Sequence, residues 1–288
     1  MESKTAQVTP ADTDHEAALL QKIAARQATL AVVGLGYVGL PLATEFALIG
    51  FRVWGLDVDP ARVEQINQGD SYVGDVNSAI LHGVVAKQLL QATTDDAVLG
   101  QADAVIVCVP TPLRKTKDPD VSYIADAVER IRRHARAGQL VVLESTTYPG
   151  TCEELVAPRL ADSGLEVGRE LFLAFSPERV DPGNKRYSTR NIPKVVGGVD
   201  PASARVARAL YEQVVEAVHP VSSTKAAEMV KLLENTFRSC NIGMINEFAL
   251  ICDRMDVDVW EVIEAASTKP FGFMPFYPGP GLGGHCLP

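Results

Sequence analysis

The sequence has 288 residues, of which 47% are hydrophobic and 22% are charged, and it carries a formal net charge of −9. A chain of this length buries one large core or two smaller ones, and its acidic balance argues against a nucleic-acid partner or an anionic membrane surface. Its longest apolar runs are too short to cross a bilayer, and its polar amino terminus lacks a signal-peptide core. We therefore predict a cytoplasmic protein with no nucleic-acid and no membrane partner.

The first organised region predicts a strand–helix–strand unit. Residues 1–28 form an amino-terminal extension with one short amphipathic helix at 15–27. Next, TLAVVG is typical of a buried strand, LGYVG of a tight turn, LPLATEFALIG of a helix and RVWGLDVD of a second strand. A further helix is predicted from Pro60, because proline is tolerated in the first helical turn. This order is a βαβ unit.

Strands and helices go on alternating as far as residue 222. Predicted strands begin at ADAVIVC, QLVVLES, ELFLAFS, PKVVGG and AVHPVSS, and predicted helices cover SYIADAVERIRRHAR, residues 151–163 and DPASARVARALYEQVV. Ser122 is the expected N-cap of the first of these helices. This alternation predicts an α/β fold, with a doubly wound, mainly parallel sheet of Rossmann type over residues 29–222.

The pattern changes at Ser223. Residues 223–268 contain no proline and are apolar at near-helical spacing, which indicates one very long helix or two helices joined near 254–258. A helix longer than about 25 residues is unusual in a compact domain. We therefore expect this segment to connect domains or to pack against a second subunit in a homodimer. Residues 269–288 are rich in proline and glycine and are predicted to form a loop.

A glycine-rich turn follows the first predicted strand. In GLGYVG, Gly34 permits the tight turn, Gly36 allows a pyrophosphate to approach the backbone, and Gly39 lets the helix lie close to the strand. Phosphates would then meet the positive end of that helix. The candidate cofactor-binding residues of the turn are Gly34, Gly36, Tyr37, Val38 and Gly39. A glycine turn that binds no ligand is the alternative.

An acidic residue at the end of the second strand favours the dinucleotide interpretation. Asp57 stands about 20 positions after Gly36, where a carboxylate accepts hydrogen bonds from an adenosine ribose and repels a 2′-phosphate. The predicted cofactor is therefore NAD rather than NADP. Arg62 is a candidate for stacking on adenine or pairing with phosphate, and an exposed helix residue is the alternative.

Other polar residues stand where catalysis could use them. Thr111 in VPTP and Thr146 in ESTTYPGT each follow a strand, at the edge that lines the ligand crevice of open α/β sheets; turn-forming hydroxyls are the alternative. Glu178 in SPERVDPGN is a candidate general acid or base, or else a solvated loop residue. Lys231 and Asn235 lie four apart, hence on one helix face. There they could stabilise an oxyanion or hold a water, unless the lysine only extends past an apolar stripe to solvent.

The last residues, GPGLGGHCLP, place Cys286 among glycines. Glycine lets the backbone close on a bound molecule. A thiolate there can attack an aldehyde to form a thiohemiacetal, which loses a hydride to become a thioester. An inert cysteine is the alternative. Because the five cysteines are widely spaced and form no CxxC pair, we expect no disulfide framework and no metal site.

Seven motifs, taken in order, resemble those of the UDP-glucose/GDP-mannose dehydrogenase family. They are VVGLGYVGLPLA, GLDVD, VPTP, ESTTYPGT, SPERVDPGN, EMVKLLENTFR and GPGLGGHC, and they extend from about residue 29 to the last residue. The resemblance implies an NAD-dependent enzyme that oxidises the C6 alcohol of a nucleotide sugar twice, to the carboxylate, and that forms a homodimer through the long helical segment. It also implies that Asp57, Arg62, Thr111 and Thr146 contact the cofactor.

The same resemblance implies the catalytic roles. Cys286 is similar to the nucleophile of the family, Glu178 to a catalytic acid or base, and Lys231 and Asn235 to residues that position an oxyanion and a water. His285 before the cysteine is similar to the branch that acts on UDP-N-acetylhexosamines in surface-polysaccharide synthesis. UDP-N-acetylglucosamine is the substrate implied, with UDP-N-acetylmannosamine or UDP-glucose as alternatives.

The resemblance is to the first part of such an enzyme. Family members continue past the cysteine into an aspartate and a third, UDP-binding domain, so the chain resembles a C-terminally truncated member. We therefore expect it to bind NAD but to oxidise a UDP-sugar poorly or not at all. Two other interpretations are a non-catalytic module that binds NAD and dimerises, and a dehydrogenase of the β-hydroxyacid type. The latter shares a Rossmann domain and a long helix but needs no terminal cysteine.

Overall fold

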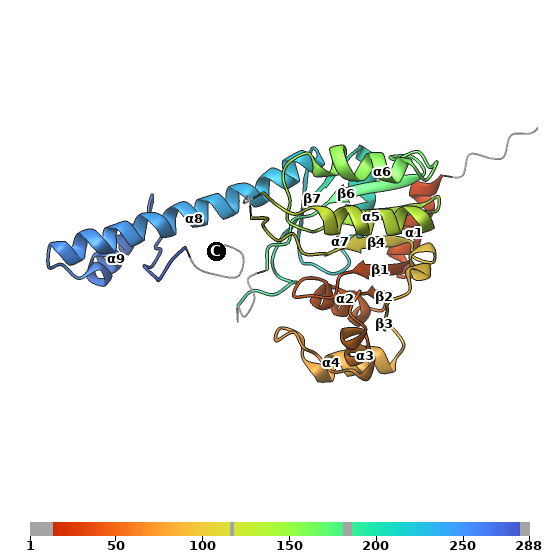
Figure 1. The fold of residues 1–288 in the computed structure, drawn as a ribbon, viewed down its shortest axis with the longest axis horizontal. Coiled ribbons are helices and arrows are strands. Elements are labelled where there is room, and N and C mark those ends of the chain that lie inside the picture. Colours follow the sequence, from red (N-terminus) through yellow and green to blue (C-terminus); the bar gives the residue numbers. More distant parts are fainter. Residues whose placement is uncertain (1–13, 116–117, 181–185, 283–288) are drawn as a thin grey trace, which may run out of the picture. The chain divides into compact units, whose positions relative to one another are not determined.

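A computed structural model describes residues 14–115, 118–180 and 186–282 (Figure 1). The chain divides into two compact units, residues 1–228 and 229–288, and each is described by itself. The domain limits predicted from the sequence, after residues 28, 222 and 268, stay predictions. Within the described residues, no helix is long and apolar enough to cross a membrane.

The first unit follows the predicted alternation of strands and helices. Its strands are β1 Thr29–Val33, β2 Arg52–Leu56, β3 Leu90–Thr93, β4 Ala104–Val107, β5 Gln139–Leu143, β6 Leu171–Phe175, β7 Lys194–Gly198 and β8 Val218–Val221. Its helices are α1 His15–Ala24, α2 Gly39–Leu48, α3 Pro60–Gln68, α4 Ser78–Ala86, α5 Ser122–His134, α6 Ala157–Ala161 and α7 Pro201–Tyr211. Two short helical segments, η1 Asp96–Gly100 and η2 Cys152–Val156, complete the set.

The eight strands form one sheet in the order β3-β2-β1-β4-β5-β6-β7-β8 (Figure 1). Strands β1 to β6 run parallel, and β7 pairs with β6 in the antiparallel sense before β8 continues parallel to β7. The chain leaves β1 toward β2 on one side and returns to β4 on the other, which makes the β1/β4 junction the switch point of a doubly wound sheet. The predicted fold class is confirmed.

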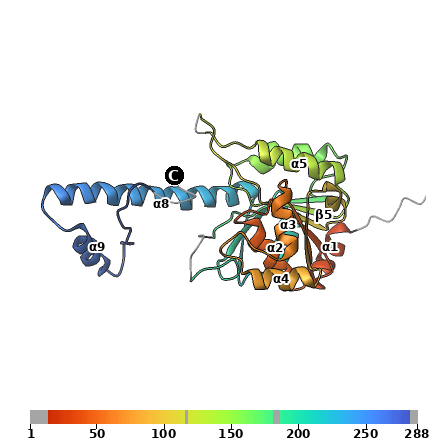
Figure 2. The same cartoon turned by 60° about the horizontal axis from the view of Figure 1, so that its bottom comes forward.

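Helices cover both faces of the sheet. Successive strand residues point to opposite faces, so Leu30 and Val32 contribute to the core cluster that contains α1, α2, α4 and α7 residues, whereas Ala31 and Val33 do not. All four side chains are buried. Figure 2 shows α5 on one side of the sheet and α2 and α4 on the other. A sheet covered on both faces explains why its strands are nearly continuous apolar runs.

Three details differ from the sequence analysis. Residues 69–101, whose sequence predicts no element, contain α4, β3 and η1. Ser122 is the first residue of α5 and not its N-cap, which is Val121; the Ser122 amide instead donates to the Asp120 carboxylate at 3.1 Å. The sequence predicts β7 as one more strand of a mainly parallel sheet, but β7 runs antiparallel to its neighbour β6.

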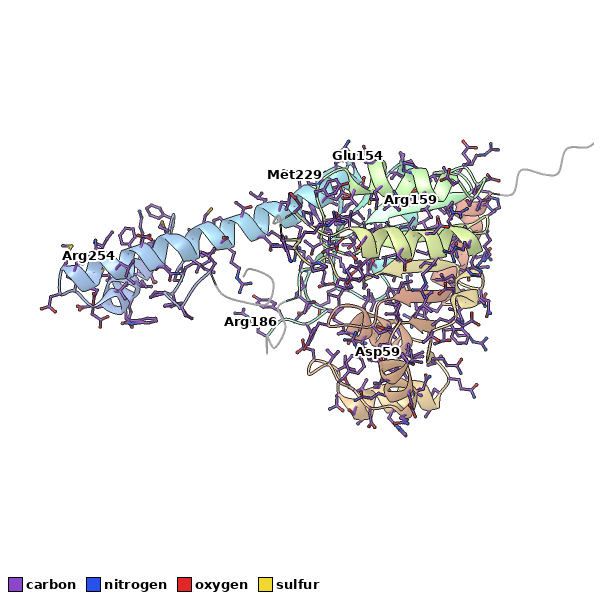
Figure 3. The ribbon with its side chains drawn as sticks, in the orientation of Figure 1. Asp59, Glu154, Arg159, Arg186, Met229 and Arg254 are labelled. Carbon is purple, nitrogen blue, oxygen red and sulfur yellow. The ribbon has the colours of Figure 1, made fainter. Side chains whose placement is uncertain are left out.

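The second unit consists of two helices and an irregular segment. Helix α8, Thr224–Arg254, begins in the first unit, and α9 covers Val259–Ser267; Met229 and Arg254 mark α8 in Figure 3. The two-helix alternative is therefore confirmed. The Asp258 side chain accepts a hydrogen bond from the Trp260 amide at 2.8 Å and so caps the second helix. The described part of the predicted loop, residues 269–282, contains no helix or strand.

Candidate active site

The glycine turn after β1 has the shape that the sequence predicts. Gly34 adopts φ +89°, and a Cβ added there would lie 2.7 Å from the Cys108 carbonyl oxygen. A Cβ at Gly39 would lie 1.8 Å from the Gly34 carbonyl oxygen, so neither position tolerates a side chain. At Gly36, by contrast, an added Cβ would meet no heavy atom within 4 Å. The backbone is therefore open at the one glycine where a pyrophosphate is expected to approach.

Asp57, just beyond β2, holds this turn in place. Its buried carboxylate accepts hydrogen bonds from the Leu35 amide at 2.9 Å and from the Asp59 amide at 3.0 Å. Arg62 places Nη1 3.8 Å from the same carboxylate, and Asp59, at the start of α3, is labelled in Figure 3. Two amide contacts leave acceptor capacity on a carboxylate, which has about four lone-pair sites.

Tyr72 holds the main chain of the same turn at Leu35. Its hydroxyl donates to the Leu35 carbonyl oxygen at 2.6 Å, and the Arg62 guanidinium lies 5.5 Å from its ring centroid. Burial, followed by the negative charge of Asp57, raises the pKa of Tyr72 to about 12, so the hydroxyl remains a donor at neutral pH. Sequence analysis missed this residue, because it stands 37 positions from Leu35 in a segment without a recognisable motif.

These residues fit a bound NAD. The turn leaves an open backbone at Gly36, follows β1 and begins α2, and Asp57 lies at the end of the adjacent strand. That is the arrangement in which phosphates meet a helix amino terminus and a carboxylate meets a ribose. Tyr37 is exposed and Val38 is half-buried in the same turn.

Thr111 and Thr146 meet where β4 and β5 end. The Thr111 hydroxyl donates to the Thr146 carbonyl oxygen at 2.6 Å, and the Ser145 hydroxyl donates to the Val109 carbonyl oxygen at 2.7 Å. The two loops are thus joined at the carboxyl edge of the parallel strands, which is also the edge reached by the glycine turn. The Thr111 hydroxyl therefore joins the two loops, Thr146 takes part through its main-chain carbonyl, and both residues lie at the ligand edge.

Glu178, beyond the end of β6, is not a solvated loop residue. One carboxylate oxygen accepts the Arg179 and Val180 amides, at 2.8 and 2.6 Å, and the other accepts the Lys194 ammonium at 3.1 Å. Burial alone would raise the pKa of Glu178, but Lys194 and the two amides outweigh burial and hold it below its usual value. Glu178 is therefore a carboxylate at neutral pH, which suits a base better than an acid.

Two predicted catalytic residues lie on α8 in the second unit. Lys231 and Asn235 are both half-buried, and their four-residue spacing places them on one face of the helix. Cys286 and His285 lie outside the described residues. The segment that leads to them is tied to α8 by Asn246, whose side chain accepts the Gly279 amide at 2.9 Å and donates to the Gly281 carbonyl oxygen at 3.2 Å. Sequence analysis missed Asn246 as well.

Comparison with known proteins shows which family the two units represent. Residues 28–215 match the domain described as UDP-glucose/GDP-mannose dehydrogenase family, NAD binding domain, and residues 225–288 match the central domain of the same family. The chain belongs to the UDP-glucose/GDP-mannose dehydrogenase family. Its first unit is therefore an NAD-binding domain, which confirms the predicted cofactor, and the β-hydroxyacid alternative is wrong.

Relatives within the family include enzymes for N-acetylated sugars. The chain is 41% identical over 260 residues to UDP-N-acetyl-D-glucosamine 6-dehydrogenase of Pseudomonas aeruginosa, covering 90% of the chain and 60% of that protein. It is 36% identical over 262 residues to UDP-N-acetyl-D-mannosamine dehydrogenase of Methanococcus aeolicus, covering 90% and 58%. The UDP-D-ManNAc dehydrogenase structure from Pyrococcus horikoshii matches with a TM-score of 0.85 at 38% identity, covering 90% and 62%. The chain thus spans about three fifths of the length of the relatives that it matches.

Proposed function

We propose that the chain is the NAD-binding and central part of an NAD-dependent enzyme that oxidises C6 of a UDP-N-acetylhexosamine to the carboxylate, with UDP-N-acetylglucosamine as the substrate. The observation that carries this proposal is the match to the family through both domains, from residue 28 to residue 288. The sugar follows from the relatives, which include dehydrogenases of both UDP-N-acetylglucosamine and UDP-N-acetylmannosamine. A cytoplasmic role in surface-polysaccharide synthesis is part of the same proposal.

The residues of the first unit would bind and orient the cofactor. The Gly36 backbone and the amino terminus of α2 receive the phosphates, and Asp57 receives the adenosine ribose while it keeps the turn closed. Arg62, beside Asp57 and Tyr72, covers the adenine. Thr111 and Thr146 line the path between the β4 and β5 loops. When NAD is bound there, it accepts a hydride from the substrate carbon.

The other proposed roles concern the sugar. Glu178, held as a carboxylate, acts through a water to remove the proton of the C6 hydroxyl in the first oxidation. Lys231 and Asn235 stabilise the resulting alkoxide from one face of α8. The Cys286 thiolate then adds to the aldehyde carbon to form a thiohemiacetal, which becomes a thioester by giving up a second hydride, for which a second NAD would be the acceptor. Water near Glu178 cleaves the thioester, which releases the carboxylate and restores the thiol.

A substrate panel tests this proposal on the protein expressed from its complete coding region. With NAD, we expect UDP-N-acetylglucosamine to give the fastest NADH formation among UDP-N-acetylglucosamine, UDP-N-acetylmannosamine and UDP-glucose. Mass spectrometry should show the uronic acid, formed with two NADH per sugar. In Cys286→Ser the second oxidation should fail. Uronic acid formation at the wild-type rate by this variant would contradict the thioester route, and NAD binding without any sugar-dependent NADH would indicate a non-catalytic module instead.

We further propose that α8 and α9 form a homodimer interface. The second unit carries several large apolar side chains that are more than 45% exposed, among them Leu233, Phe248, Leu250, Met255 and Trp260. Burial of such side chains between two copies would be favourable by about 25 cal/mol per Å². Light scattering should give a dimer mass for the wild type and a monomer mass for Phe248→Glu. The matched variant Tyr123→Glu, at an exposed aromatic of the first unit, should remain a dimer.

A further inference from the structure

A buried lysine lies between two glutamates at the carboxyl edge of the sheet. Lys194 is 5% exposed, and its ammonium donates to Glu144 at 2.7 Å and to Glu178 at 3.1 Å. Glu144 directly follows β5 and is 1% exposed. Nothing in the sequence distinguishes this lysine, which opens the short strand PKVVGG. Its position has to be explained by the fold.

The reversal of β7 brings the lysine to this edge. Strand β6 pairs with β7 through Phe175 opposite Gly197 and Ala174 opposite Gly198. Continuing the same antiparallel register outward from β6 brings Lys194 opposite Glu178. In a parallel strand the first residue would lie at the amino edge, away from the ligand crevice. The antiparallel pairing of β7 with β6 therefore brings a cation to the glutamate that we place in catalysis.

Among the residues that the structure describes, four titratable groups surround the Lys194 ammonium, each from a different part of the fold. Glu144 comes from the end of β5, Glu178 from the loop after β6, Tyr211 from the end of α7 and Cys108 from the end of β4. The Tyr211 hydroxyl donates to Glu144, and its ring centroid lies 5.1 Å from the ammonium. Two carboxyl groups thus share one cation, and a buried cluster of this kind favours one proton on one of the carboxyls.

The environments decide where that proton resides. Burial raises the pKa of Glu144 to about 7, although Lys194 opposes the rise. Glu178 has two backbone amides as additional donors, and its pKa is lowered despite burial. Burial would lower the pKa of Lys194, but the two carboxylates raise it, so the lysine stays charged. Burial also raises the pKa values of Cys108 and Tyr211, which stay neutral.

We propose that Lys194 is a positioning residue for Glu178: its buried ammonium, 3.1 Å from the carboxylate, fixes the Glu178 side chain at the sheet edge in its charged form. The catalytic meaning of this arrangement rests on the proposed function, because only there does Glu178 act as a base. Lys194 itself contacts neither substrate nor cofactor in this scheme. It acts through the glutamate that it holds.

Carboxyl titration of the 288-residue chain tests the proposal without any turnover. In carbon-13 spectra of glutamate-labelled protein, the Glu178 signal is assigned by its loss in Glu178→Gln. In the wild type, Glu178 should remain ionised between about pH 5 and pH 8. In Lys194→Met, its titration should move upward by at least about one pH unit, because an opposite charge at hydrogen-bond distance is lost. Lys194→Arg should restore the wild-type titration.

Two further variants keep the result decisive. The double variant Lys194→Met/Glu144→Gln removes the cation together with one buried carboxyl group. It therefore does not leave Glu144 as a buried carboxylate without its cation, which would destabilise the fold. The pKa of Glu178 should still be raised in this variant. Lys225→Met removes an exposed lysine that is paired with Glu153, and it should leave Glu178 unchanged. An unchanged Glu178 titration in either variant that lacks Lys194 would overturn the proposal.

Activity separates this inference from the proposed function. In the protein from the complete coding region, the acid limb of the kcat profile should move to higher pH in Lys194→Met and return in Lys194→Arg. If the wild type oxidises no nucleotide sugar but the titration still shifts, the proposed function fails and the charge-fixing role of Lys194 stands. If activity is present while neither the titration nor the acid limb moves, the function stands and the role of Lys194 is wrong.

Discussion

At the scale of single residues, the cofactor turn depends on contacts to the main chain of one residue, Leu35. The Leu35 amide donates to Asp57, and the Leu35 carbonyl oxygen accepts from Tyr72. The glycines permit the turn, but these two side chains select its conformation. Asp57 both closes the turn and is expected to face the ribose, whereas Tyr72 only closes the turn. Loss of the Asp57 contact should therefore weaken NAD binding more than loss of the Tyr72 contact.

Asp57→Asn should weaken NAD binding strongly. The change removes the charge that accepts the Leu35 and Asp59 amides, and charged hydrogen bonds contribute about 1.5–3 kcal/mol each. We expect a loss of about 10- to 100-fold in affinity by calorimetry. Asp59→Asn is the matched control, because asparagine caps α3 as well as aspartate does. Equal effects of the two substitutions would show that general charge, and not the Asp57 contacts, governs binding.

Tyr72→Phe should have a smaller effect on the same affinity. It removes only the hydroxyl that donates to Leu35, and a neutral hydrogen bond contributes about 1 kcal/mol, which corresponds to about fivefold. The ring that stacks with Arg62 stays in place. Tyr123→Phe, at an exposed position of α5, serves as the control and should bind NAD normally. An unchanged affinity in Tyr72→Phe would mean that Asp57 alone selects the turn.

At the scale of elements, the second unit contains a defined tether between a helix and the segment that precedes Cys286. Asn246 on α8 bonds to both Gly279 and Gly281, Trp260 stacks on Tyr277 with ring centroids 6.0 Å apart, and Phe237 meets Phe276 at 5.8 Å. A nucleophile on a loop needs such support if it is to meet its substrate reproducibly. The tether makes the loop part of the α8 framework.

Asn246→Ala should loosen this segment. Loss of the bond from the Gly279 amide, worth about 1 kcal/mol, should speed hydrogen exchange of that amide on the order of fivefold. Asn241→Ala is the control, since the Asn241 side chain donates to Phe237 within its own helix. Faster exchange at residues 275–282 in Asn246→Ala alone is the expected outcome. The same rate in both variants would leave the aromatic contacts as the main tether.

The sequence predicts those elements whose own residues form a recognisable pattern, such as an apolar run or a glycine spacing. Strands β4 and β6 are buried on both faces and are continuous apolar runs, β1 and β5 depart from this only at their first residue, and the glycine turn has its own spacing. Strand β3, LQAT, is too short and too polar to stand out. The direction of β7 leaves no local trace, because PKVVGG suits either orientation and only pairing with β6 decides it.

The residues of the candidate site likewise divide into those that a local sequence pattern predicts and those that it does not. Asp57 could be predicted because its distance from the glycines is set by one strand–helix–strand unit. The partners of Glu178 could not, since Lys194 is 16 residues away and Glu144 is 50 residues from Lys194, and only the pairing of the strands brings the three side chains together. Tyr72 and Asn246 act through contacts to the main chain, which leave no pattern of side-chain types in the sequence.

At the scale of the whole molecule, one buried carboxylate joins three segments of the first unit at the amino edge of the sheet. Asp103 accepts hydrogen bonds from Lys22 at 2.8 Å, Arg136 at 2.7 Å and the Thr29 amide at 2.9 Å. Burial alone would raise the pKa of Asp103, but these donors outweigh burial and hold it below its usual value. The contacts fasten α1, β1 and the residues before β5 to the start of β4.

Asp103→Asn should therefore destabilise the protein in a pH-dependent way. A lowered pKa in the folded state contributes stability that is present above the unfolded value of about 4 and is lost as the pH falls through the folded value. At neutral pH we expect the free energy of unfolding in urea to fall by about 1–3 kcal/mol, with the difference shrinking in acid. Asp70→Asn, at an exposed site, is the control. A constant difference at every pH would contradict the charged role of Asp103.

The central claim is that the first unit is an NAD site organised by the Asp57-held turn, and calorimetric titration of the 288-residue chain with NAD and with NADP tests it most directly. The Asp57 carboxylate should favour the free ribose hydroxyl over a 2′-phosphate. We therefore predict saturable binding of NAD and binding of NADP that is weaker by about tenfold or more, which corresponds to at least about 1.4 kcal/mol. Equal affinity for both cofactors, or no binding of NAD, would contradict the claim.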